Sequence, residues 1–299
     1  MQRPIDRPYR DLELDLLRCP DCGGSIGKGL TCLTCQRGFA FDEGVYNLLP
    51  ERLADVKRHE DSVFADGSEE VARTLARPWR RIMGRTEVQR FDREIVDTFP
   101  GGRFLELGGE SCFASAIFKS VFPDSTVYAS DVSPNALRNA GLPTARMFPS
   151  EPDFFVALDA ENIPFQDSTF NSIFALTMMH HLPNPVRMLV EVQRVLAPGG
   201  RFVAVDAAVP AHFRWLFQGT ANNRSRRYGI KEDLISFSQW SLMVRTSGME
   251  PESLRIYTDP SYQYDPVFAL AGRVIHRLPP SAAMRLFPVG IMIVYDRPL

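Results

Sequence analysis

Residues 104–131 constrain the fold of this chain more than any other stretch. They read as a short apolar strand, a turn at Gly108 and Gly109, an apolar helix and a second strand that ends in an acid. A strand, a glycine turn, a helix and a parallel strand form the first half of a nucleotide-binding α/β unit. The two glycines permit a tight turn, and the following helix presents unpaired N–H groups to a ligand. The sequence therefore predicts an α/β fold built around this unit.

Two acids in the same stretch indicate the kind of ligand. Asp131 follows the glycines by about 20 residues, where an acid at the tip of the second strand can accept hydrogen bonds from two ribose hydroxyls. Glu106 lies inside the first strand, where its carboxylate could face a cationic amine rather than a pyrophosphate. No lysine of a phosphate-binding loop follows the glycines. This combination favours a nucleoside without phosphates.

Several further blocks carry a resemblance to a known family. In order, they are residues 106–109, 129–134, 159–165 with 167–171 after them, 179–182 and 194–200. Together they run from about residue 103 to residue 206, and they resemble a class I S-adenosylmethionine-dependent methyltransferase. The resemblance implies a Rossmann-like seven-stranded methyltransferase sheet with helices on both faces and an antiparallel seventh strand.

The resemblance also implies which residues bind the cofactor, S-adenosylmethionine. Asp131 would hold the ribose, Asp159 would accept from the adenine amino group, and Ala160 would offer a backbone N–H. The plain alternative for Asp159 is a helix or turn cap. The full cofactor set is Glu106, Gly108, Gly109, Glu110, Asp131, Val132, Asp159, Ala160 and Thr177.

The glycine loop departs from the family at two places. Glu110 and Cys112 stand where the family usually has two more glycines, and a Cβ or carboxylate there would crowd a ligand. Glu110 could instead lie near the sulfonium or the methionine amine, both of which are positive. The other reading is a non-catalytic binding or scaffold protein with a degenerate cofactor loop.

The catalytic candidates are His180, His181 and Asp206. The two histidines follow an expected strand at 172–176, and Asp206 ends an expected strand at 201–205. Ligands of open α/β sheets bind outside the carboxyl ends of the strands. A histidine there could take a proton from a substrate hydroxyl, since its ordinary pKa lies near neutral pH. The alternative for His181 is a packing and hydrogen-bonding role.

Four of the five cysteines form two closely spaced pairs near the N-terminus. Paired CxxC knuckles suit tetrahedral Zn²⁺, because each offers two thiolates to one ion. Four thiolates leave no open coordination position, so a structural role is expected. Disulfides or reduced core cysteines are the alternatives. The predicted ligands are Cys19, Cys22, Cys32 and Cys35.

These features divide the chain into three parts. We expect a tail and zinc ribbon at 1–50, a helical linker or lid at 51–98 and the methyltransferase domain at 99–299. Two cap insertions are expected within the last part, at about 211–232 and 261–288. Candidate substrate or phosphate contacts outside the strands are Trp79, Arg80, Arg81, His212, Arg224, Arg226 and Arg227.

Composition limits the function classes. The 299 residues are 44% hydrophobic and 23% charged with a net charge of −2, which gives no overall attraction to nucleic acid or anionic membrane. No apolar run reaches the roughly 20 residues of a membrane span, and no signal peptide is evident, so a cytoplasmic protein is expected. No Ser-His-Asp or phosphoryl-transfer constellation occurs. The favoured hypothesis is methyl transfer to a small-molecule acceptor such as a sugar or a biosynthetic metabolite. The alternative enzyme is an rRNA or tRNA base methyltransferase, and a homodimer is left open.

Overall fold

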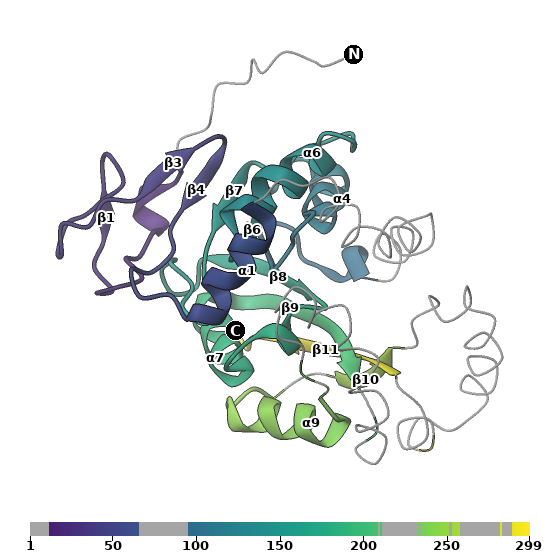
Figure 1. Cartoon of the computed structure of the whole chain (residues 1–299). Coiled ribbons are helices and arrows are strands. Elements are labelled where there is room, and N and C mark those ends of the chain that lie inside the picture. The colour runs from purple at the N-terminus through teal and green to yellow at the C-terminus, as the bar shows by residue number, and fades with distance from the viewer. Residues whose placement is uncertain are drawn as a thin grey trace.

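The computed structural model describes residues 12–65, 95–208, 235–250, 253–257 and 289–299, with residues 210, 233 and 282. Apart from residue 282, the predicted insertions at 211–232 and 261–288 lie outside the described residues. The candidates Trp79, Arg80 and Arg81 also lie outside them. Within the described residues, one nine-stranded sheet has the order β10-β11-β9-β8-β5-β6-β7-β4-β3 (Figure 1).

Seven of these strands make the predicted α/β sheet. Five are parallel to one another, and β11 runs antiparallel to both β9 and β10. The predicted antiparallel seventh strand is therefore confirmed. β9 exceeds its predicted span of 201–205 at both ends, because its pairing with β11 continues to Ala208 and Leu196 pairs with Phe170 of β8. The strands are β5 (Arg103–Leu107), β6 (Thr126–Asp131), β7 (Phe154–Ala157), β8 (Phe170–Leu176), β9 (Leu196–Ala208), β10 (Ser253–Tyr257) and β11 (Val289–Asp296).

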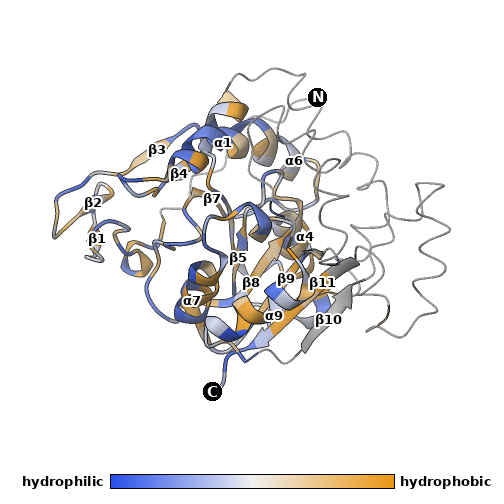
Figure 2. Ribbon diagram, turned by 60° about the horizontal axis from the view of Figure 1, so that its bottom comes forward, coloured by the Kyte–Doolittle hydropathy of each residue, from blue (hydrophilic) through white to orange (hydrophobic). Residues whose placement is uncertain are grey.

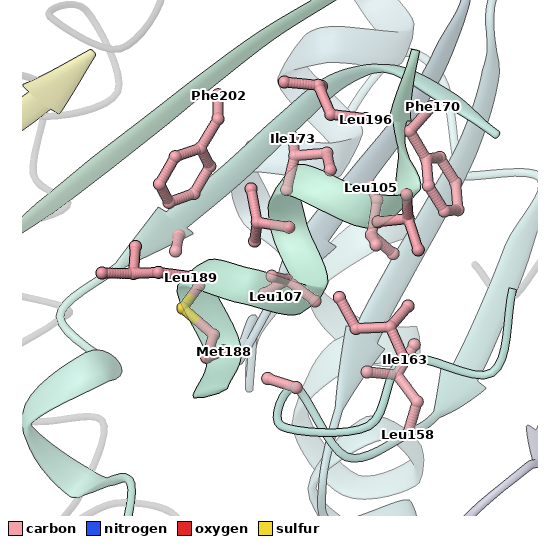
Figure 3. Close-up of a cluster of buried hydrophobic side chains, with 14 of the residues drawn as sticks. Leu105, Leu107, Leu158, Ile163, Phe170, Ile173, Met188, Leu189, Leu196 and Phe202 are labelled. Atoms are coloured by element: carbon pink, nitrogen blue, oxygen red, sulfur yellow. The ribbon is translucent and has the colours of Figure 1, made fainter. Parts of the chain in front are cut away.

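Helices cover both faces of the sheet, because successive strand residues point to opposite sides. Leu105 and Leu107 of β5 pack with Met188 and Leu189 of α7 (Figure 3). Phe104 points to the other face and stacks on Phe118 of α4, with ring centroids 3.9 Å apart. The helical segments are α1 (Asp55–Ala65), α4 (Phe113–Val121), α5 (Pro134–Ala136), α6 (Leu142–Ala145), α7 (Pro185–Val195) and α9 (Phe237–Thr246), with the short turns η1 (Leu14–Leu16), η3 (Val96–Thr98), η4 (Leu137–Gly141) and η5 (Met179–His181).

The N-terminal ribbon extends the sheet beyond the seven predicted strands. Its hairpin of β3 (Ala40–Asp42) and β4 (Val45–Asn47) joins the main sheet, because β4 pairs in parallel with β7. The other hairpin, β1 (Ile26–Gly27) with β2 (Thr31–Cys32), forms a separate two-stranded sheet. An edge strand such as β7 presents unpaired N–H and C=O groups, and β4 satisfies them. The seven predicted strands are therefore present, and the ribbon hairpin adds two more to the same sheet.

Hydropathy follows this arrangement. In Figure 2 the central strands are largely apolar, whereas α1 and the loops of the ribbon carry many hydrophilic residues. None of the helices in the described ranges is both long and apolar enough to cross a bilayer.

Candidate functional site

The site lies at the carboxyl ends of the parallel strands, and Asp131 at the end of β6 connects two of its loops. Asp131 is 7% exposed. One carboxylate oxygen accepts from the backbone N–H of Ser133 at 2.9 Å, and the other accepts from the N–H of Glu110 at 2.9 Å. Burial raises the pKa of Asp131, although these N–H groups oppose the rise. The side chain thus holds the loop after β5 against the loop after β6.

The loop after β5 keeps a left-handed backbone where the family has glycines. Gly108 has a φ of +62°, and the non-glycine residues Glu110 and Cys112 have φ values of +42° and +53°. A Cβ on Gly108 would lie 2.7 Å from the Cβ of Met178, so only glycine fits there. Strained non-glycine residues of this kind cost about 1–3 kcal/mol each and gather at functional sites. Glu110 and Cys112 therefore hold a backbone conformation that glycine adopts without strain.

Glu106 and Glu110 lie in poorly solvated surroundings. Glu106 is 2% exposed, and its carboxylate accepts from the N–H of Ser115 in the first turn of α4 at 2.8 Å. Burial raises the pKa of Glu106 to about 7. Burial together with the charge of Asp131 raises the pKa of Glu110 to about 7. A positively charged ligand would stabilise the ionised form of these groups.

The loop after β7 carries Asp159, which is 7% exposed. One of its oxygens accepts from the N–H of Glu161 at 2.8 Å and from the ammonium of Lys57 at 2.6 Å. Lys57 belongs to α1, is 4% exposed and also pairs with Glu161 at 3.3 Å. Sequence reasoning missed Lys57, because a single lysine in a polar helix gives no signal of a partner 102 residues away.

His180 and Asp206 are brought together at the ends of β8 and β9. His180 Nδ1 and an Asp206 oxygen are 2.7 Å apart, and the other oxygen accepts from the N–H groups of Met179 at 3.0 Å and His180 at 3.3 Å. The Asp206 side chain is 1% exposed. Because an ionised carboxylate can only accept, Nδ1 is the donor in this contact, and in a neutral ring the proton is then absent from Nε2. The ring of His181 lies beside that of His180, with centroids 4.0 Å apart.

Three predicted contacts complete the strand ends. Val132 follows β6, and Ala160, 5% exposed, lies in the loop after β7. Thr177 directly follows β8 and has a φ of +50°, a third strained non-glycine residue at this edge of the sheet. The assignment of these residues to cofactor binding stays a prediction.

The four predicted metal ligands converge at the ribbon. Their sulfur atoms all lie within 4.8 Å of one another. Cys19 and Cys35 sulfurs are 3.7 Å apart, and those of Cys22 and Cys32 are 3.5 Å apart. Tetrahedral Zn²⁺ with Zn–S bonds of about 2.3 Å requires sulfur–sulfur distances of about 3.8 Å. The cluster therefore fits a structural zinc ion.

The two knuckles repeat the same backbone geometry. The Cys19 carbonyl accepts from Gly23, and the Cys32 carbonyl accepts from Gln36 at the equivalent position. Both of these fifth residues are left-handed, with φ values of +76° and +61°. N–H groups also point at sulfur: that of Cys35 lies 3.5 Å from Cys32 Sγ and is the main cause that lowers the pKa of Cys32 to about 6. Such N–H···S contacts stabilise the thiolates that a metal ion needs.

We expect the ligand-free protein to lose stability as the pH rises from about 4.5 to about 8. Burial raises the pKa of Glu106 and Glu110 to about 7, and that of Glu60 to about 8, from an ordinary value of 4.5. The folded state therefore binds these protons more tightly than the unfolded state. Its advantage is complete below pH 4.5 and disappears as the pH passes through the folded pKa values. Urea unfolding from pH 4.5 to 8.5 measures this, and the variant Glu110→Gln should show a shallower loss. A pH dependence that is identical in the variant would contradict the expectation.

The strand order and the acids at the strand ends define a Rossmann-like nucleotide-binding domain. Residues 105–204 match the methyltransferase domain family. This part of the chain belongs to that family and is a class I S-adenosylmethionine-dependent methyltransferase domain.

Individual proteins agree with this assignment. The chain is 30% identical over 111 residues to 27-O-demethylrifamycin SV methyltransferase of Amycolatopsis mediterranei, which covers 36% of this chain and 40% of that protein. It is 30% identical over 134 residues to a ubiquinone/menaquinone biosynthesis C-methyltransferase of Desulfotalea psychrophila, covering 44% of this chain and 53% of that protein. The chain thus spans about half or less of the length of these relatives.

A solved structure shares the fold. Phospholethanolamine N-methyltransferase 2 of Haemonchus contortus, in complex with phosphomonomethylethanolamine and S-adenosylhomocysteine, has a TM-score of 0.59 at 14% identity. The match covers 83% of this chain and 61% of that one. At this identity the likeness concerns the fold alone.

Proposed function

We propose that the protein transfers a methyl group from S-adenosylmethionine to a small-molecule acceptor. The observation that carries the proposal is that Asp131, Asp159 and His180 follow β6, β7 and β8 at the carboxyl edge of the sheet of a methyltransferase domain. Asp131 would accept from the ribose hydroxyls, and Asp159 from the adenine amino group. The left-handed loop at 108–112 lets the backbone approach the ligand closely. The sulfonium, when bound, makes its own methyl group electrophilic.

His180 is the proposed general base. Asp206 fixes the ring through Nδ1 at 2.7 Å and leaves Nε2 able to accept a proton from an acceptor hydroxyl or amine. The buried carboxylate would also stabilise the imidazolium that forms. Holding the acceptor about 3–3.5 Å from the methyl carbon would supply much of the remaining rate acceleration.

A small acceptor is favoured over RNA. Carboxyl groups dominate the described part of the site, and the net charge of the chain is −2, whereas RNA binding depends on cationic contacts to phosphates. The names of the two bacterial relatives describe methylation in rifamycin and quinone biosynthesis, both of which concern small molecules. The particular acceptor and the methylated atom stay open within this proposal.

Calorimetry tests the cofactor part of the proposal. We expect the protein to bind S-adenosylmethionine, and Asp131→Asn to weaken binding by about tenfold or more, because an amide cannot accept with both atoms. Asp124→Asn, an exposed position, is the matched control and should bind as the wild type does. No heat and no thermal shift with the wild type would favour the non-catalytic scaffold. Label from a methyl-labelled cofactor should appear in the small-molecule fraction of a cell extract; label in RNA would favour the alternative enzyme.

A further inference from the structure

The loop after β7 is bonded both to the N-terminal ribbon and to α1 (Figure 1). The side-chain amide of Asn162 donates to the Pro20 carbonyl of the ribbon at 2.7 Å, and its backbone N–H donates to the Asp159 carbonyl at 2.9 Å. These two bonds fix the backbone of the loop. Lys57 of α1 instead contacts the side chain of Asp159, the acid proposed to meet adenine.

The two carboxylate oxygens of Asp159 have different surroundings. Oδ1 accepts from the Lys57 ammonium at 2.6 Å and from the backbone N–H of Glu161 at 2.8 Å. No group in the described ranges of the chain donates to Oδ2. Two donors on one oxygen restrict rotation of the carboxylate about its Cβ–Cγ bond. Oδ2 is therefore the oxygen left to accept from a ligand, and its orientation is fixed by the contacts of Oδ1.

Lys57 is almost completely buried, which is an unusual environment for a lysine. Its ammonium lies 2.6 Å from Asp159 and 3.3 Å from Glu161. Removing charged groups from water is unfavourable, and their mutual attraction in a buried pair does little more than offset that loss. The pair therefore contributes little net stability compared with apolar packing. Its main effect is to hold the carboxylate of Asp159 in one orientation.

We propose that Lys57 is a positioning residue that makes the site specific for a purine with an amino group at its six position. The inference rests on the proposed function, in which Asp159 accepts from the adenine amino group. A fixed Oδ2 attracts an N–H of that group. It repels the carbonyl oxygen that hypoxanthine carries at the same position, because an ionised carboxylate can only accept. Lys57 acts on the ligand through Asp159.

Calorimetry on the zinc-loaded protein tests this with S-adenosylhomocysteine and S-inosylhomocysteine, which differ at that position of the purine. We expect the wild type to bind the adenosyl ligand about 100-fold more tightly, because the inosyl ligand brings an acceptor against Oδ2. Lys57→Met, which keeps an apolar stem, should reduce this ratio to about tenfold or less. Lys57→Arg, which keeps a cationic donor, should retain most of it. In an Asp159→Asn background, Lys57→Met should not change the ratio further, since the two residues act as one unit.

Lys119→Met is the matched control. Lys119 of α4 pairs with Asp153 at 2.8 Å, and the two side chains are 12% and 8% exposed. This pair lies at the opposite end of β7, because Asp153 directly precedes the strand. Removal of either lysine leaves a poorly solvated carboxylate without its partner, so both variants should lose thermal stability. Lys119→Met should nevertheless keep the wild-type affinity for both ligands.

The outcomes separate this inference from the proposed function. A ratio that survives in Lys57→Met, with or without an equal weakening of both ligands, overturns the role of Lys57 while cofactor binding stands. Tighter binding of the adenosyl ligand by this variant also overturns it, since Lys57 would then compete with the base. Equal affinities of the wild type for the two ligands overturn it as well. If the wild type binds neither ligand, the proposed function fails too. If Lys57→Met does not fold, Lys57→Gln gives the same test, because its amide is neutral and its side chain is shorter.

Discussion

Cys32→Ser is expected to abolish metal binding and to lower Tm by about 10 °C or more. The metal ion contributes much of the folding free energy of a small ribbon, and a variant that cannot bind the ion loses this contribution. The effect should spread into the sheet, because the ribbon is bonded to it at several points. Leu48 donates to the Ala157 carbonyl at 2.9 Å, and Gln166 donates to the Leu16 carbonyl at 2.8 Å. Hydrogen exchange should therefore rise in β7 and in the following loop. Metal analysis measures the zinc content of the variant, and calorimetry measures its Tm.

Cys112→Ser is the matched control for this experiment. Cys32 and Cys112 are both completely buried, but Cys112 lies at the start of α4, away from the four ligands. Its variant should keep one equivalent of zinc and normal exchange in β7. Retention of zinc by Cys32→Ser, or equal metal loss in both variants, would contradict the assignment of the centre.

Asp206→Ala is expected to destabilise the protein by about 3–5 kcal/mol and to lower Tm by roughly 5–10 °C. The carboxylate accepts from two backbone N–H groups and one ring nitrogen while almost fully buried, so its removal leaves those donors unpaired. Asp167→Ala is the control, because Asp167 pairs with Arg194 at 2.9 Å but its side chain is 73% exposed. That change should cost less than about 1 kcal/mol. Equal losses in the two variants would contradict the role given to Asp206.

The conservative change Asp206→Asn separates stability from tautomer control. An amide that donates to Nδ1 would move the ring proton of His180 to Nε2 and remove the proposed base. Nitrogen NMR of the histidine rings at pH 8 should show this change for His180 and not for His181.

Much of the fold and part of the site could be predicted from short-range patterns. Three local patterns predicted structural features that are present. The glycines mark the turn after β5, the acid marks the end of β6, and the CxxC spacing marks the cysteine cluster. The placement of His180 and Asp206 at one edge of the sheet followed from a general rule, since parallel strands deliver their carboxyl ends to the same edge, but their pairing was not predicted. The 2.7 Å distance between His180 Nδ1 and Asp206 and the burial of that carboxylate depend on how the side chains pack, which the sequence does not show.

The contributions of α1 and of the ribbon hairpin could not be predicted in the same way. Lys57 lies in a polar helix whose composition equally describes a solvated surface, and its partners Asp159 and Glu161 are distant in sequence. The pairing of β4 with β7 depends on which edge of the sheet is free, and periodicity within a three-residue strand does not report that. At Glu110 the sequence left two possibilities open, crowding of a ligand or a contact with its positive groups, and the left-handed backbone of this residue could not be predicted from its type.

The junction of β4 with β7 also bears on how the molecule avoids its own copies. Without the hairpin, β7 would be an edge strand with unpaired N–H and C=O groups. A strand of another chain could pair with these groups, as happens in aggregation. With the hairpin in place, the outermost strand on this side is β3, which has three residues and ends at the charged pair Asp42 and Glu43. An edge strand this short, with charged residues at its end, offers few backbone groups for pairing with a strand of another molecule. In the described part of the chain, the ribbon hairpin therefore covers an edge of the sheet that would otherwise be open to pairing with another chain.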